Sequence, residues 1–207
     1  MLVMSGTRRS AMAVQQCSPV ALRRLIDAAM ELERRTMYLY CAFESRFSER
    51  AELRGFWFDM AQHESRHFGA LALVGGLLES ASKRKLRTAT ALTPARVQHL
   101  RRLLAAFEAE AGRGVTVERA FEIAIEIESS EIEDVVLDLL QVLKGEAERE
   151  RAVQLLIHDL GDLSYMIEKH TTNHALLERA DRLLEHQVGR LRSKAATPVR
   201  RLRRVRG

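Results

Sequence analysis

The chain has little cysteine, proline or glycine. It holds two cysteines (Cys17 and Cys41), three prolines and 11 glycines among 207 residues. Two cysteines exclude a disulfide scaffold and every zinc or iron site built from CxxC pairs. So few prolines and glycines disfavour strand-and-turn architectures, which need frequent turn residues. We therefore expect a reduced protein with two free thiols.

Long apolar runs and a leader pattern are also lacking. The longest run of apolar residues and glycines is 69–78, which is too short to cross a bilayer. Near the start, Arg8, Arg9 and Ser10 are followed by four apolar residues and then by the polar Gln15 and Gln16, which does not match a signal peptide. We expect a cytoplasmic protein without a membrane span.

Positive charge is concentrated at one end of the chain. The formal net charge is +5, but residues 188–207 carry seven arginines and Lys194 without any acid. The rest of the chain is therefore at −3. This distribution argues against a nucleic-acid-binding core and restricts an electrostatic partner to the C-terminal segment.

Apolar residues recur at helical spacing from residue 18 onward. Ser18-Pro19 and Thr93-Pro94 each place a capping residue before a proline, a pair that starts helices. The predicted helices cover residues 18–45, 52–78, 93–112, 117–144 and 146 to beyond 186, with a further segment over 179–191. Two long helices, a link over 80–116 and two more long helices predict an all-α fold. The predicted arrangement is a ferritin-like four-helix bundle with one long crossover between the second and third helices.

In this bundle the first helix is antiparallel to the second, and the third is antiparallel to the fourth. The domain organisation follows from the same pattern. We expect an N-terminal tail over 1–17, the bundle over 18–192 and a basic disordered tail over 193–207.

The two halves of the chain share a pattern of acidic residues. Glu33 lies on the apolar stripe of the first helix and is expected to face the core, and Glu128 repeats this with Glu131 one turn on. A buried carboxylate is costly unless a cation neutralises it. The matching segments are 29–33 with 124–128, 52 and 64 with 150 and 162, and 64–67 with 162–165.

Glu64 and His67 are three residues apart, which places both side chains on one helical face. Together with an inward Glu33 and Glu128, this pair has the ligand pattern of di-iron carboxylate bundles. Tyr40 either donates a hydrogen bond to a metal-bound carboxylate or is an ordinary core tyrosine. His63 is rotated by 100° from Glu64, so we expect it at the surface or at an interface.

The segments Glu-Leu-Glu33, Tyr40 and Ala-Gln-His-Glu64-Ser-Arg-His67 resemble a rubrerythrin-like member of the ferritin-like superfamily. The resemblance spans about residues 20–178 and is stronger in the first half. It implies two irons inside the bundle that react with oxygen or peroxide, as in ferroxidases and peroxidases. It also implies roles for five residues: Glu33 and His67 as terminal ligands and Glu64 as a bridging ligand of the first iron, Glu128 as a terminal ligand of the second, and Glu131 as an additional carboxylate.

The second iron position departs from this pattern. Asp162 stands where a second bridging glutamate is expected, and Tyr165 stands in place of the second histidine. His158, four residues before Asp162, can supply the missing imidazole. Rubrerythrins also carry a rubredoxin domain, which this chain lacks, so redox turnover needs an external electron donor. We expect a homodimer or a higher oligomer.

Two functions stay open. The first is an iron-binding ferritin-like oxidoreductase acting on Fe(II) with oxygen or hydrogen peroxide. The alternative is a metal-poor degenerate bundle acting as a structural or interaction protein, which Asp162 and Tyr165 favour. The basic tail is either without a partner, or contacts an anionic surface (nucleic acid or membrane), or docks the protein as cargo into an encapsulin shell. The last reading rests on the order Val-x-x-Leu-Arg-Arg over 199–204, which is similar to encapsulin docking segments.

Overall fold

A computed structural model describes residues 15–16, 19–80, 87–88, 93–130 and 146–195. Helices dominate this part of the chain: α1 (Pro19–Arg46), α2 (Ala51–Ser80), α3 (Pro94–Arg113), α4 (Val117–Glu128), α6 (Glu146–His170) and α7 (His174–Ala195). The two-residue strands β1 (Gln15–Gln16) and β2 (Arg87–Thr88) form a short antiparallel pair. The prediction of an all-α protein is confirmed apart from this pair. In the described segments no helix combines the length and hydropathy that a membrane span requires.

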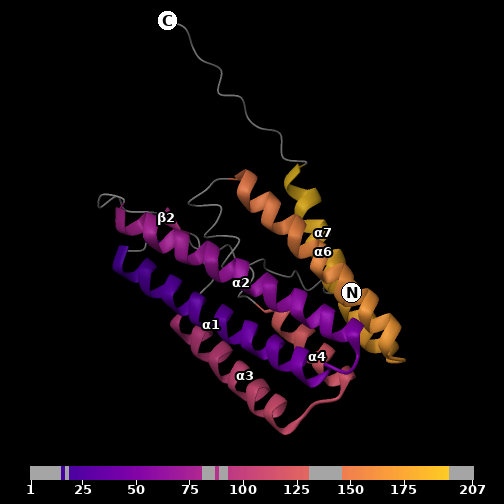
Figure 1. The fold of residues 1–207 in the computed structure, drawn as a ribbon. Helices are drawn as coiled ribbons and strands as arrows, with labels where there is room; N and C mark the ends of the chain where they lie inside the picture. The colour runs from indigo at the N-terminus through magenta and orange to yellow at the C-terminus, as the bar shows by residue number, and fades with distance from the viewer. Residues whose placement is uncertain (1–14, 17–18, 81–86, 89–92, 131–145, 196–207) are drawn as a thin grey trace, which may run out of the picture.

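α1 and α2 form an antiparallel helical hairpin. Residues 47–50 join them in a tight turn, in which the amide of Arg50 donates to the carbonyl of Phe47 at 2.9 Å. So short a link returns the chain directly alongside α1, as predicted. Figure 1 shows the two helices side by side over most of their length.

α3 lies along the other side of α1 (Figure 1). It begins at the predicted position, where the hydroxyl of Thr93 accepts a hydrogen bond from the amide of Arg96, and it ends before Gly114, whose φ of 96° favours glycine. Arg35 of α1 holds Glu108 of α3 through two hydrogen bonds of 2.8 Å each. Much of the expected crossover is therefore a helix fixed along α1. Its buried residues are Val97, Leu100, Leu104 and Phe107.

α4 begins at Val117, as predicted, but it ends at Glu128 instead of running on to 144. The hydroxyl of Ser129 bonds back to the carbonyl of Glu126 at 3.2 Å, and such local bonds from serine compete with helix continuation. The prediction of one continuous helix through Ser129 and Ser130 is therefore wrong. Residues 131–145 lie outside the described residues, as do most of the expected tails.

α6 and α7 form a second hairpin, on the α2 side of the molecule (Figure 1). Residues 171–173 separate them, and the side chain of Asn173 caps α7 by accepting the amide of Leu176 at 3.1 Å. The predicted fourth helix with a further segment is therefore a pair of helices, and both contact α4.

Aromatic rings join α1, α2 and α4 in the core. Trp57 lies 4.9 Å from Phe43 and 5.5 Å from Phe121, measured between ring centroids, and Phe56 packs edge-on to both Trp57 and Phe121. Phe43, Trp57 and Phe121 are fully buried. This aromatic cluster positions α4 against the α1–α2 hairpin.

Replacing Phe121 with alanine should leave a cavity among these rings. We expect Phe121→Ala to lower the free energy of unfolding by about 3–5 kcal/mol, measured by urea denaturation followed by circular dichroism. The matched control is Phe58→Ala, because Phe58 is exposed. That variant should stay within about 0.5 kcal/mol of the wild type. Equal losses in the two variants would contradict the packing of α4 described above.

Candidate metal centre

α2 is buried on two sides, and this double burial creates the site. One side packs on α1 and another on α6. The buried positions of α2 therefore come in neighbouring pairs, such as Phe56 with Trp57 and His63 with Glu64. On α1, Glu33 follows the buried Leu32 and faces α2.

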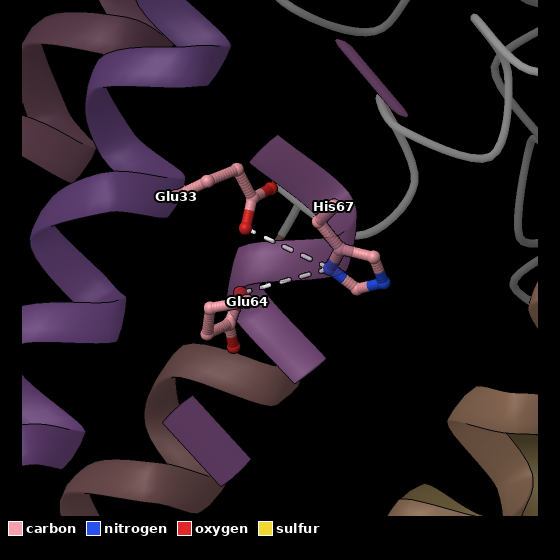
Figure 2. Close-up of side chains that lie close together, drawn as sticks. All are labelled: Glu33, Glu64 and His67. Carbon is pink, nitrogen blue, oxygen red and sulfur yellow. Dashed lines mark ion pairs between the residues drawn. The ribbon is translucent and has the colours of Figure 1, made fainter. Parts of the chain in front are cut away.

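Glu33, Glu64 and His67 converge at the interface of α1 and α2 (Figure 2). One potential ligand atom from each lies within 4.8 Å of the other two. The Nδ1 atom of His67 is 3.7 Å from Oε2 of Glu33 and 3.6 Å from Oε2 of Glu64. The exposed fractions of the three residues are 0%, 1% and 6%, so the expected burial of all three is confirmed.

These two carboxylates lack the partners that buried acids normally have. Both oxygens of Glu33 and Oε1 of Glu64 are buried without a hydrogen bond to any described residue. No lysine or arginine in the described segments forms an ion pair with either carboxylate. Burial raises the pKa of the Glu64 carboxyl well above its usual range, and the charge of Glu33 raises it further, while His67 offsets part of this rise.

Such a group fits a divalent metal ion. Two oxygens and one imidazole nitrogen match the donors that iron, manganese and zinc take in proteins. A cation at this point would neutralise both carboxylates and satisfy their buried oxygens. The separations of 3.6 and 3.7 Å need only small side-chain adjustments, since two ligands about 2.1 Å from one ion lie about 3.0–3.4 Å apart.

Glu128 is buried, as predicted, but it is not part of this three-residue group. Its Oε1 accepts a hydrogen bond from the hydroxyl of Tyr40 at 2.9 Å. Tyr40 thus supports a carboxylate on α4 and links α1 to α4 through the core. Glu131, the other acid expected near it, lies outside the described residues.

The expected second half-site does not face the interior. The side chains of His158 and Asp162 are 74% and 60% exposed, and they pair with each other at 3.3 Å. Tyr165 is exposed too, beside Lys169. Asp162 was expected inside, with either His158 or Tyr165 beside it, and this prediction is wrong, because the spacing of the acids does not determine which face of α6 is buried. That face carries Leu156, Leu160, Leu163 and Ile167, and Asp162 is rotated by about 100° from Leu163.

His63 and Asp159 form a contact between α2 and α6 next to His67. His63, expected at the surface or at an interface, is 1% exposed, and its ring centroid lies 4.1 Å from that of His67. Its Nδ1 approaches Oδ2 of Asp159 on α6 at 3.2 Å. Burial, followed by the charges of His67 and Arg66, lowers the pKa of His63 to about 2. Burial raises the pKa of Asp159 to about 6.

Sequence reasoning missed both residues, although a signal for each was present. The paired apolar positions of α2 indicate a helix buried on two sides, which would have placed His63 inside. Asp159 directly precedes Leu160 and borders the apolar stripe of α6, as judged from the positions of its leucines.

Comparisons with protein-family models, with curated proteins and with solved structures find no match to this chain. The resemblance to rubrerythrin-like proteins therefore rests on the quoted residues alone.

The raised pKa of Glu64 has a consequence for the metal-free protein. A carboxyl whose pKa is raised by folding takes up a proton on folding, so the free energy of unfolding falls as pH rises above the usual value of 4.5. We expect Glu64→Gln, in the presence of a chelator, to lose less stability than the wild type between pH 4.5 and pH 7. Urea denaturation at a series of pH values measures this.

The control is Asp59→Asn, which changes an exposed acid on the same helix and should keep the wild-type pH dependence. Parallel curves for the wild type and Glu64→Gln would contradict the assignment.

Proposed function

We propose that this protein binds an iron ion through Glu33, Glu64 and His67 and acts as a ferritin-like oxidoreductase on Fe(II) with oxygen or hydrogen peroxide. The observation that carries the proposal is a pair of buried carboxylates that share one imidazole and, among the described residues, no basic partner. Such an arrangement is stable at neutral pH only with protonation or a bound cation.

The helix contacts support a ferritin-like bundle made of α1, α2, α4 and α6. The turn at 47–50 joins the first pair, and the Tyr40–Glu128 hydrogen bond and the aromatic cluster join α4 to it. The contact of His63 with Asp159 connects α2 to α6. The order α1, α2, α3, α4, with α3 along α1, is compatible with a long crossover between the second and third bundle helices.

The charge of the ligand set favours iron oxidation. Two carboxylates balance the charge of Fe(II), and the added charge of Fe(III) is stabilised by the same anionic groups in a water-poor site. Three protein ligands leave positions open for a small molecule, as in other catalytic metal sites. Iron bound there would supply one-electron chemistry with oxygen or peroxide, and the protein's part is to hold the ligands and exclude water.

A single ion provides one electron, whereas reduction of peroxide to water needs two. Because Asp162, His158 and Tyr165 point outward, the expected second half-site does not supply a second iron at the interior. An oxidoreductase with this site therefore works with an external electron donor, or uses Fe(II) itself as the substrate.

The outward placement of those three residues also favours the alternative function. A bundle with only a vestigial ligand cluster would be a structural or interaction protein. Metal affinity separates the two functions, because a vestigial cluster would not bind Fe(II) stoichiometrically.

We expect anaerobic Fe(II) loading of the chelator-stripped protein to give one tightly bound iron per chain at the Glu33 site. Glu33→Gln and His67→Gln should each weaken that binding by more than about 100-fold, because a ligand is lost, against the 10–100-fold typical of residues that support ligands. Glu44→Gln on α1 is the matched control and should bind iron like the wild type. If the wild type binds no iron, or if both ligand variants bind it like the wild type, the proposed site is contradicted. The protein would then be a structural or interaction protein.

Oxidation is tested separately from binding. Air-oxidation of Fe(II), followed with an oxygen electrode, should be faster with the wild-type protein than with Glu33→Gln at equal iron and protein concentrations. The same rate in both would show that the site stores iron without promoting its oxidation.

A further inference from the structure

We propose that two copies of this chain pair through the outer face of α2, with the two α2 helices antiparallel. The contact is an uncharged stripe, called the α2 stripe below, on the side of the helix that is turned away from Glu64. Its members are Gly55, Phe58, Gln62, Ser65, Gly69, Ala72, Leu73 and Gly76. The inference does not depend on the proposed function, because the stripe contains none of the three candidate metal ligands.

The α2 stripe has the spacing of a helix–helix contact, yet it faces solvent. Seven of its positions, from 55 to 76, follow one another at alternating steps of three and four residues, the repeat of helices that pack lengthwise. Gln62 is half-buried and the other members are exposed. Phe58 and Leu73, 53% and 54% exposed, are two of the six large apolar side chains exposed in the described segments. Such a face is typical of a surface that a partner covers.

Two glycines of the stripe favour the close approach of another backbone. A Cβ atom added at Gly55 or Gly69 would meet no atom of a neighbouring described element within 4 Å, and neither residue has a positive φ. Gly75 differs, because it lies against Arg23 and Ile26 of α1. A glycine inside a helix lowers the stability of that helix. At Gly55 and Gly69 a second helix on the stripe would use the space that the missing side chains leave.

The order of large and small residues fits an antiparallel copy of the same stripe. A two-fold axis level with residue 64 places Leu73 opposite the partner's Gly55. The same axis places Phe58 between the partner's Gly69 and the partner's Ala72. Each large side chain therefore meets small ones, as the packing of ridges into grooves requires. This self-complementarity identifies a second copy of the chain as the partner.

Charge at the border of the stripe also fits a second copy. Asp59 and Arg66 are exposed and lie on one flank of α2, about 20° apart around the helix axis. In the antiparallel pair this flank meets the same flank of the other copy, so Arg66 comes within about one turn of the partner's Asp59. The two-fold axis repeats this contact between opposite charges. Arg54, on the other flank, already pairs with Glu44 of α1 at 3.6 Å.

The area of the contact predicts a reversible dimer. Residues 55–76 span about 33 Å of helix, and a strip about 12 Å wide gives about 400 Å² per chain, against about 800 Å² in a typical stable interface. The adjacent face of α1 adds the exposed Tyr38 and Cys41. Both are level with Phe58, because the contact of Glu44 with Arg54 sets the register of the hairpin. We therefore expect a dissociation constant on the order of micromolar.

Sedimentation equilibrium of the full-length protein tests the inference, from nanomolar to high micromolar concentration. The wild type should change from the chain mass of 23.5 kDa to twice that mass. Gly69→Glu places a charge on the stripe without meeting a neighbouring element, and it should weaken the dimer at least about 100-fold because the charge would be buried. The matched control is Gly189→Glu on α7, also an exposed helical glycine with open space around it, which should dimerise like the wild type.

A second variant removes apolar contact instead of adding charge. Phe58→Ala should weaken the dimer at least about 30-fold, because a large side chain at the centre of an interface carries much of the binding energy. In dilute solution, where the chain is monomeric, urea denaturation of Phe58→Ala should match the wild type, since Phe58 is exposed in the single chain. The loss of dimer is then separate from any loss of folding.

Cysteine cross-linking tests the antiparallel orientation. In a Cys17→Ser/Cys41→Ser background, Ser65→Cys lies beside the two-fold axis and should give a covalent dimer on mild oxidation, since its Cα atom and the partner's come within disulfide range. Ala72→Cys lies on the same stripe, but the antiparallel arrangement separates the two copies of this position by about 24 Å along the helices. It should stay uncross-linked.

Three results would overturn the inference. The first is a wild type that keeps the mass of one chain at every concentration, in which case the stripe belongs to an interface with a different protein. The second is a dimer that Gly69→Glu and Phe58→Ala leave unchanged, because it would form through another surface. The third is cross-linking of Ala72→Cys as readily as Ser65→Cys, which excludes the antiparallel pair. Each leaves the Glu33 site untouched, since iron loading measures that site separately.

Discussion

The main physical constraint on the structure is the burial of two carboxylates, those of Glu33 and Glu64, on facing helices. Their mutual repulsion and desolvation oppose close packing of α1 on α2, and His67 alone offsets only part of this cost. The large apolar interface between α1 and α2, with Trp57 and Phe43 at its centre, holds the hairpin together despite it. The surrounding helices exclude water, so the two charged carboxylates lower the stability of the fold unless a proton or a cation neutralises them.

Local periodicity explains what could be predicted. Glu33 falls on the repeat of Leu22, Ile26 and Ala29, so its burial followed from spacing. Glu64 and His67 lie one turn apart, which placed them on one face of their helix, and the four-helix pattern placed that face inside. The start of α3 followed from its capping residue, Thr93, which acts within its own segment.

Long-range packing explains what could not be predicted. The inward face of α6 is chosen by its contact with α2 and α7, and the spacing of acids in the other half of the chain carries no information about it. For this reason Asp162 was expected where Asp159 lies, and His63 was expected at the surface or at an interface. α4 ends at Ser129, where the serine hydroxyl competes with backbone amides for the carbonyl of Glu126. Helix propensity alone does not predict the outcome of that competition.

The two imidazoles of α2 stand on neighbouring turns of one unbroken helix, six and ten residues beyond Trp57. The spacing of seven residues between Trp57 and Glu64 therefore cannot change without moving the ligands away from α1. A single inserted or deleted residue there would rotate Glu64, His63 and His67 together by about 100° while the aromatic anchor stayed in place. An insertion in the turn at 47–50, by contrast, would leave the spacing between Trp57 and the three ligands unchanged.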